Sequence, residues 1–247
     1  MNRFQVAAIH LGLSIVVGII ILALMLGLWY PGGYFKLLGG SSLLYIIMGV
    51  DVCLGPLLTL IVFKQGKKSL KFDLSVIALL QLSALVYGTV IMFQTRPAFN
   101  VLEKDVFKVT LATQLQDKEL AKAKNPEWRQ LPLKGPVLVA AIEPTDHEEQ
   151  QAMVTAAMSG LDWNLFPSLY VSYDSQRKVA LSHAKPLSKL REVSAESAVV
   201  VDEFLKEQNS KEDNFVYLPI VMGVESMTAV LDAKNADFID IIDVVTP

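Results

Sequence analysis

The sequence predicts a membrane protein in which three transmembrane α-helices precede a soluble α+β domain. Hydrophobic residues make up 52% of the 247-residue chain and charged residues 19%, and the mean hydropathy is +0.41, a balance typical of membrane insertion. The charge is also divided, because residues 1–94 carry six Lys/Arg and two acids whereas residues 95–247 carry 16 and 23. We therefore expect a basic membrane domain over residues 1–96 and an acidic soluble domain over residues 98–247.

Three apolar segments of the first domain are long enough to cross a bilayer, which takes about 20 residues. They extend from about residue 4 to 28, from 42 to 63 and from 73 to 94. A cleaved signal peptide is the alternative for the first, but its apolar stretch is too long and no small-residue cleavage site precedes Trp29. The aromatic cluster at residues 29–35 predicts an interfacial belt, and Pro31-Gly32-Gly33 ends the helix.

The lysine distribution predicts the orientation. Four lysines lie between Lys64 and Lys71, after the second span, whereas the loop after the first span contains only Lys36. Because Lys and Arg concentrate in cytoplasmic loops, we expect a cytoplasmic N-terminus and lysine loop, with the residues after Arg96 outside the cytoplasm. Binding of anionic lipid or nucleic acid is the alternative reading of the run, although topology is sufficient to explain it. The acidic second domain argues against a nucleic-acid partner.

The second span carries the main candidate site. Asp51 lies near its middle, and Gly55-Pro56 follows one turn later. A carboxylate at that depth is costly and is typically functional, while Pro56 leaves a carbonyl of the preceding turn without its N–H partner. Two interpretations stay open: a tolerated kink whose carboxylate bonds a neighbouring helix, or a site that contacts a partner or switches.

Depth restricts the internal partners of Asp51. At about 1.5 Å per residue, Asp51 lies roughly 12 Å from the outer face, level with Tyr87 of the third span. We therefore expect Tyr87, Ser83 or Gln81 to bond it, and expect His10, near the opposite face, to be a packed or hydrogen-bonded residue rather than a ligand.

Small residues predict close packing of the spans. Ser14 and Gly18 in the first span, and Ala84 and Gly88 in the third, have the small-xxx-small spacing that lets helices approach. A compact three-helix hairpin is therefore expected rather than three separate anchors.

Several motifs of the spans occur together and in a fixed order. They are Trp29-Tyr-Pro-Gly, the stretch GVDVCLGPLLTLIVFK at residues 49–64, LKFDL at residues 70–74, Gln81, Tyr87-Gly88 and Arg96-Pro97. In these motifs about the first hundred residues resemble the TfpX/TfpZ family of type IV pilin accessory proteins. The rest of the chain contributes no motif to the resemblance.

The resemblance implies a multi-pass inner-membrane protein of a Gram-negative bacterium with a periplasmic C-terminal domain. It implies a non-enzymatic, chaperone-like role, without a cofactor, in making one cognate major type IV pilin available for pilus assembly. The pilus assembly machinery is a further candidate partner. The candidate residues for partner contact or an intramembrane polar motif are Asp51, Gly55, Pro56, Gln81 and Tyr87.

The second domain predicts an α+β fold with a largely antiparallel sheet. We expect strands at 106–111, 136–142, 169–172, 178–182, 214–222, 226–232 and 238–244. We expect helices at 112–124, at 145–158 with a capping box of Thr145 and Glu148, and at 195–208 with Val199, Val200, Phe204 and Leu205 inward.

Catalytic patterns are missing from the sequence. The only cysteine, Cys53, lies in a span, and the second domain has only His147 and His183, neither with metal-ligand spacing. No phosphate-binding glycine loop or nucleophile triad is present, so we expect neither an enzyme nor a metal site. A membrane-anchored sensor or transporter subunit, whose periplasmic domain binds a small ligand and moves the Asp51 helix, stays open as the alternative function.

Overall fold

The computed structural model describes residues 2–158 and 160–246, without the side chains of residues 43, 46–47, 148–149, 152 and 156–157. It contains two compact units. The helical unit comprises the residues up to Leu28 together with Gly39–Thr95, and the sheet unit comprises Trp29–Leu38 together with the residues from Arg96 onward. The short segment after the first helix therefore belongs to the sheet unit.

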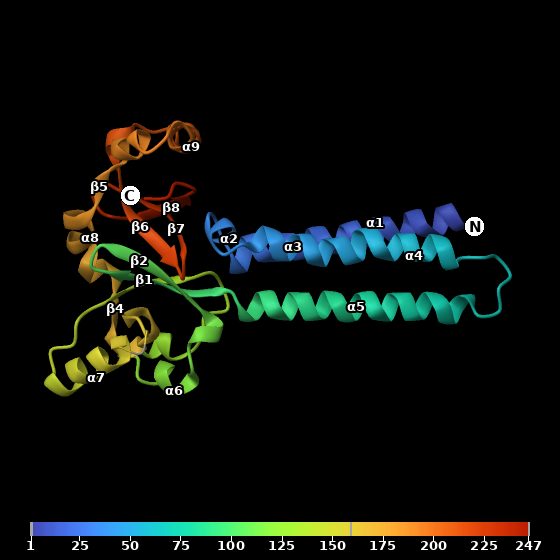
Figure 1. Ribbon diagram of the computed structural model, residues 1–247, viewed down its shortest axis with the longest axis horizontal. Helices are drawn as coiled ribbons and strands as arrows, with labels where there is room; N and C mark the ends of the chain where they lie inside the picture. The colour runs from blue at the N-terminus through green and yellow to red at the C-terminus, as the bar shows by residue number, and fades with distance from the viewer. Residues whose placement is uncertain (1, 159, 247) are drawn as a thin grey trace. The chain divides into compact units, whose positions relative to one another are not determined.

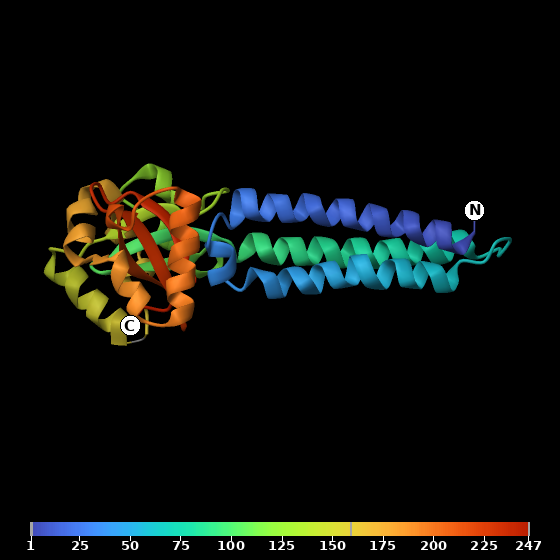
Figure 2. The ribbon, with the colours of Figure 1, turned by 90° about the horizontal axis from the view of Figure 1, so that it is seen from above.

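The helical unit consists of long helical segments that run side by side (Figures 1 and 2). In chain order they are α1 (Arg3–Leu24), the π-helix η1 (Met25–Trp29), α3 (Gly40–Met48), the π-helix η2 (Gly49–Leu54), α4 (Gly55–Val62) and α5 (Leu70–Gln94). The N-terminus of α1 is fixed by a capping box, in which Asn2 and Gln5 each accept a hydrogen bond from the other's backbone N–H at 2.9 Å. The segment α4 contacts both α1 and α5.

Among the described residues, two helical stretches are long and apolar enough to cross a membrane, Arg3–Trp29 and Leu70–Gln94. The predicted second span is not one regular helix: α3, η2 and α4 follow one another there, and Gly49–Val62 is a shorter apolar helix. The chemistry at Pro56 explains the irregularity, because proline has no N–H to bond the preceding turn. The N–H of Gly55 instead bonds the carbonyl of Val50, five residues back, as in a π-helix.

The sheet unit is built on a mixed sheet that is eight-stranded over the described residues. Its strands are β1 (Pro97–Glu103), β2 (Val106–Leu111), β3 (Val137–Ala141), β4 (Tyr170–Ser172), β5 (Lys185–Pro186), β6 (Phe215–Met222), β7 (Glu225–Asp232) and β8 (Phe238–Ile242). The order is β4-β3-β1-β2-β6-β7-β8, and β5 pairs with β6. Strand β1 is parallel to β3 and β2 is parallel to β6, whereas the other pairs are antiparallel.

Short helices surround this sheet. The α-helices are α2 (Tyr34–Leu37), α6 (Asp117–Leu120), α7 (His147–Met158), α8 (Arg177–His183) and α9 (Ala195–Gln208). The 3-10 helices are η3 (Ala112–Gln114), η4 (Pro126–Arg129), η5 (Trp163–Leu165), η6 (Pro167–Leu169), η7 (Tyr173–Gln176), η8 (Leu187–Glu192) and η9 (Glu212–Asn214). Helix α9 begins where Ser194 Oγ accepts from the Ser197 N–H at 3.1 Å, and it ends at Asn209 in the left-handed conformation, φ 46°.

The predicted α+β class is confirmed, and most predicted elements of this unit are present. Strands β2, β3, β4, β6, β7 and β8 and helices α7 and α9 lie where the sequence predicts them. The sheet is largely antiparallel, as predicted, with two parallel pairs, but strand β1 was not predicted. The predicted capping box at α7 depends on the Glu148 side chain, which lies outside the described residues.

Three predictions of local structure are wrong. The segment 178–182 lies in α8 rather than in a strand, because Ala180, Leu181 and Ala184 have helical spacing and pack on the core. The predicted helix 112–124 is only η3 and α6, since it lacks a continuous apolar stripe. In α9, the predicted inward residues Val200, Phe204 and Leu205 pack on the core, but Val199 is exposed and Val201 is buried in its place.

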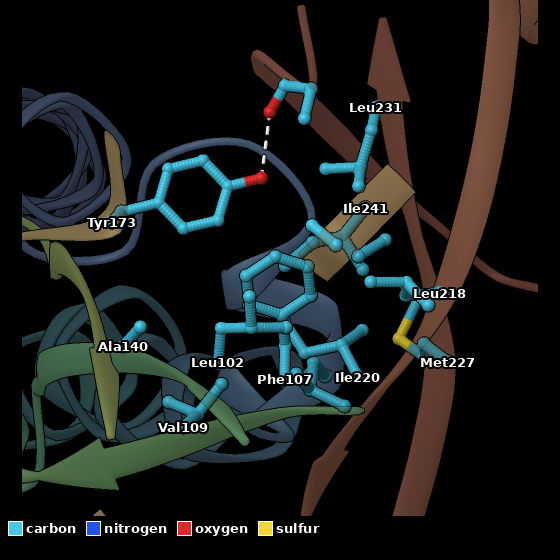
Figure 3. Close-up of a cluster of buried hydrophobic side chains, with 14 of the residues drawn as sticks. Leu102, Phe107, Val109, Ala140, Tyr173, Leu218, Ile220, Met227, Leu231 and Ile241 are labelled. Carbon is cyan, nitrogen blue, oxygen red and sulfur yellow. Dashed lines mark hydrogen bonds between the residues drawn. The ribbon is translucent and has the colours of Figure 1, made fainter. Parts of the chain in front are cut away.

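The main core of the sheet unit lies on one face of the sheet, under α2 and α8. Figure 3 shows its centre, where Phe107 and Leu102 meet Ile220 and Leu218, and where the Tyr173 hydroxyl donates to the Ala236 carbonyl at 2.6 Å. The opposite face is covered in two parts: the β1–β3 end packs on residues of α6, α7 and η6, and the β6–β8 end packs on η8 and α9.

The aromatic cluster after α1 has a different role from the predicted one. Tyr30 and Tyr34 are buried, and Tyr34 stacks on Phe238 of β8 with ring centroids 6.2 Å apart. With Leu37, Tyr34 is part of the main core. The interfacial-belt interpretation is therefore wrong for these two tyrosines, because covering the sheet buries more of their ring surface than a membrane interface would.

Candidate functional site

The residues predicted for the site come together in the helical unit, with one exception. Asp51 lies in η2 and is only 8% exposed. The side-chain amide of Gln81, from α5, donates to the Asp51 backbone carbonyl at 3.3 Å. Gly55 and Pro56 at the start of α4 are both buried. The structure thus joins the second helical segment to α5 at Asp51.

A glycine is required at residue 55 by the approach of α5. A Cβ placed on Gly55 would overlap the amide group of Gln81. The side chain of Gln81 therefore lies directly against the backbone of α4 here, in the space that a small residue leaves between membrane helices. Gly18 has the same role in α1, where an added Cβ would meet the side chain of Met48. The predicted Ser14/Gly18 pair faces its neighbours, whereas Ala84 of the predicted α5 pair is exposed.

Tyr87 lies away from this site. Its side chain is 70% exposed, and Ser83 is exposed as well, so the partner of Asp51 among the predicted candidates is Gln81. The prediction placed Tyr87 beside Asp51 by counting residues from the ends of the spans. Side-chain packing sets the register instead, and the extra residue per turn in η2 shifts it further.

A second polar contact joins α1 to α4, and Thr59 was not among the residues predicted for the site. His10 Nδ1 and Thr59 Oγ1 are 2.6 Å apart, and Thr59 is 1% exposed. A signal was available, because Asp51, Gly55 and Thr59 recur every four residues and therefore share a helix face. The polar side chains of Asp51 and Thr59 thus lie on either side of Gly55 on an otherwise apolar segment.

An open cavity of about 200 Å³ lies over Asp51. It is lined by α1, η2 and α5, through His10, Leu13, Ser14, Val17, Asp51, Ala78, Gln81, Leu82 and Leu85. Among the described residues, Asp51 Oδ1 and Gln81 Oε1 are buried and have no hydrogen-bond partner. Both of these atoms are acceptors, so these two buried atoms lack a hydrogen-bond donor.

The sheet unit holds a separate polar cavity of about 170 Å³ beside β2 and η5. Lys108 Nζ lies 3.0 Å from Glu103 Oε2 and 2.9 Å from Asp162 Oδ2, and the Asn164 N–H donates to Glu103 Oε1 at 2.6 Å. Burial raises the pKa of Glu103 despite the ammonium of Lys108. The charged groups are already paired with one another, and this pairing ties η5 to the sheet.

Among the residues that the structure describes, no group of three or more His, Cys, Asp or Glu side chains is placed to hold a metal ion. Of the three buried side-chain oxygens without a hydrogen-bond partner in the described residues, Asp51 Oδ1 and Gln81 Oε1 lie at the cavity over Asp51, and Asn100 Oδ1 lies in the sheet unit.

The family and the relatives that match this chain are all described as fimbrial assembly proteins. Residues 1–39 match the family described as "Fimbrial assembly protein FimB". The chain is 31% identical over 243 residues to the fimbrial assembly protein of serogroup I of Dichelobacter nodosus, a match that covers 97% of this chain and 94% of the relative.

A second protein from the same organism, the fimbrial assembly protein of serogroup E1, matches with the same identity and coverage. The protein of serogroups C1 and C2 is 37% identical over 107 residues, 42% of this chain and 82% of the relative. No solved structure matches. Because the similarity to two relatives extends over nearly the whole length of both partners, the chain belongs to the fimbrial assembly protein family.

Proposed function

We propose that this protein is a non-enzymatic, multi-pass inner-membrane protein that holds or presents a cognate type IV pilin for pilus assembly. The observation that carries the proposal is the near full-length similarity to proteins named for fimbrial assembly. The motifs shared with TfpX/TfpZ proteins support the narrower role toward a pilin.

Three membrane crossings are part of the proposal. Segments α3, η2 and α4 continue without a break from Gly40 to Val62, and at about 1.5 Å per residue they extend roughly 30 Å, the thickness of a bilayer core. Large apolar side chains are exposed along all three helical segments, among them Leu13, Ile61 and Leu79. Such side chains suit lipid or a partner helix. The lysine loop then favours a cytoplasmic N-terminus and a periplasmic sheet unit.

A pilin has a matching organisation, since it is anchored by one apolar helix and carries its globular head outside the membrane. The helical unit suits the anchor and the sheet unit suits the head. Binding has to be weak enough for release, because an assembly protein that retained its pilin would block the fibre.

The test compares pilin production with surface pili. Deleting the gene should lower sheared surface pili strongly while total pilin falls much less, and expression of the protein in trans should restore the pili. Affinity-tagged protein, purified in mild detergent, should retain the cognate pilin and not a pilin of different sequence.

Unchanged surface pili in the deletion strain would contradict the proposal. Pili that are lost without any recovery of pilin on the tagged protein would instead favour the sensor or transporter alternative. In that case a small molecule should raise the melting temperature of the sheet unit.

A further inference from the structure

We propose that the open cavity over Asp51 is the docking site for the partner's membrane helix, and that this helix carries a hydrogen-bond donor at the level of Asp51. This inference rests on the proposed function, since it assigns the pilin anchor to one face of the helical unit.

The shape of the cavity suits a helix. Its walls are α1 and α5, and η2 forms its floor, so an added helix would lie between α1 and α5. The rim is apolar and open, with Leu13 63% and Leu82 58% exposed. Apolar side chains of a second helix can therefore pack on the rim while one polar group reaches the floor.

The chemistry of the floor selects a donor. Gln81 already uses an amide N–H on the Asp51 carbonyl, and the Nδ1 atom of His10 is engaged by Thr59. Among the buried side-chain atoms that line this cavity in the described residues, two acceptors have no hydrogen-bond partner, Asp51 Oδ1 and Gln81 Oε1. A purely apolar helix over the cavity would remove the remaining 8% exposure of Asp51 and leave both of these atoms unpaired, which costs free energy. A hydroxyl, amide, ammonium or guanidinium group would pair them.

The acceptors are held in position before the partner arrives. Gly55 lets α4 approach the amide of Gln81 closely, and the hydrogen bond to the Asp51 carbonyl fixes the same side chain. A site whose side chains are fixed loses less conformational entropy on binding. The contact can thus be specific although it consists of few polar bonds.

Site-specific photo-crosslinking tests the position. A photoreactive residue at Leu13 or Leu82, on the rim, should form an adduct with the cognate pilin produced in the same cells. The matched controls are Ile20 on α1 and Leu79 on α5, which are exposed on the same helices and do not line the cavity. We expect adducts from the controls to be at least about fivefold fewer, the selectivity of one interhelical polar contact.

Variants of Asp51 test the chemistry. Asp51→Leu should lower the Leu82 adduct roughly fivefold, whereas Asp51→Asn, which keeps an acceptor oxygen, should retain most of it. If Asp51→Leu does not accumulate, the pilin side is varied instead. Each donor of its membrane helix is replaced in turn by leucine, and one replacement should lower the adduct by the same factor.

The outcomes separate this inference from the proposed function. Pilin that co-purifies with the tagged protein but forms no adduct at the rim overturns the docking site and leaves the function standing. Adducts with lipid alone or with a second copy of this chain also overturn it. A rim adduct that no variant of Asp51 or of the pilin donors changes overturns the donor requirement. Loss of co-purification in the unaltered protein is a failure of the proposed function itself.

Discussion

The side-chain amide of Asn100 donates a hydrogen bond of 2.6 Å to the hydroxyl of Tyr34, and both residues are buried. Tyr34 lies in the segment between the first and second helical stretches, and Asn100 lies in β1, 66 residues later. Burial raises the pKa of the Tyr34 phenol well above its usual range, so the hydroxyl stays protonated. The bond fastens the segment 29–38 to the centre of the sheet.

Replacing Tyr34 by phenylalanine should destabilise the sheet unit by about 1–3 kcal/mol, because the buried Asn100 amide loses its acceptor while the stacking on Phe238 remains. The measurement is the urea dependence of proteolysis in detergent. Tyr45→Phe, at an exposed tyrosine of α3, is the matched control. The double variant Tyr34→Phe/Asn100→Leu should recover part of the loss, and a single variant as stable as the native chain would show that the bond contributes nothing.

The limits of the sheet unit lead to a second prediction. A fragment that starts at Ala98 lacks α2, which buries Tyr34 and Leu37, and lacks Arg96, whose guanidinium donates to the Pro132 carbonyl at 2.8 and 3.0 Å. Burial of each apolar side chain contributes about 1.5–3 kcal/mol, a large share of a typical domain stability of about 5–15 kcal/mol. We expect the fragment 98–247 to melt well below a fragment in which residues 29–38 are joined by a flexible linker to residues 96–247. Equal melting temperatures would show that α2 is dispensable.

Much of the sheet unit was predictable because its strands have clear boundaries. Strand β3 is an apolar run between Gly135 and Pro144, and β6 to β8 are separated by turns at Gly223 and Asn235. Strand β1 was not predictable in the same way, since it begins at a proline and contains Asn100. That asparagine is explained only by its long-range partner Tyr34, which no local pattern reveals.

The sequence was enough to predict which residues of the second helical segment form the candidate site. It was not enough to predict which turn of α5 faces Asp51. The carboxylate and the Gly-Pro pair identified Asp51, Gly55 and Pro56, and of the three predicted partners the structure selects Gln81. Tyr87 was chosen by counting residues from the helix ends. Close packing at Gly55 and the π-helix before it determine which turn of α5 meets Asp51, and both depend on contacts between helices.

The role of Gly55 gives a third prediction. Gly55→Ala should lower the stability of the helical unit by about 0.5–1.5 kcal/mol, because the new methyl group displaces the Gln81 amide from its hydrogen bond to the Asp51 carbonyl. Gly12→Ala is the matched control, since a Cβ added there would have no neighbouring atom within 4 Å and alanine is the better helix former. Thermal unfolding of both variants in the same detergent measures the difference. Equal effects of the two substitutions would argue against the close approach of α4 and α5.

A fourth prediction concerns acid stability. Arg177 of α8 donates to Asp237 Oδ1 at 2.5 Å and to the Asn235 carbonyl at 2.8 Å, and this guanidinium holds the pKa of Asp237 below its usual value of 3.8. A folded-state pKa that is depressed stabilises the fold above the unfolded value and loses that contribution as the pH falls through the folded value. The stability difference between native chain and Arg177→Met should therefore be constant above about pH 5 and shrink below about pH 4. Lys189→Met, at an exposed lysine, should show no such pH dependence, and a difference that grows toward low pH would contradict the assignment.

The last prediction distinguishes three membrane crossings from two. With a cytoplasmic N-terminus, crossings by α1, by the α3–η2–α4 segment and by α5 place Lys67 in the cytoplasm and Pro247 in the periplasm. Alkaline phosphatase is active only outside the cytoplasm, where its disulfides form. It should therefore be inactive when fused after Lys67 and active when fused after Pro247.

If the segment from Gly40 to Val62 did not cross, both results would be reversed, because α1 and α5 alone would leave Lys67 outside and return Pro247 to the cytoplasm. That arrangement would also place the lysine loop on the side that positively charged loops avoid. Fusions after both residues, compared at equal protein levels, therefore test the second crossing directly. Activity after Lys67 and none after Pro247 would rule out three crossings from a cytoplasmic N-terminus, and with them a periplasmic sheet unit placed to meet the head of a pilin.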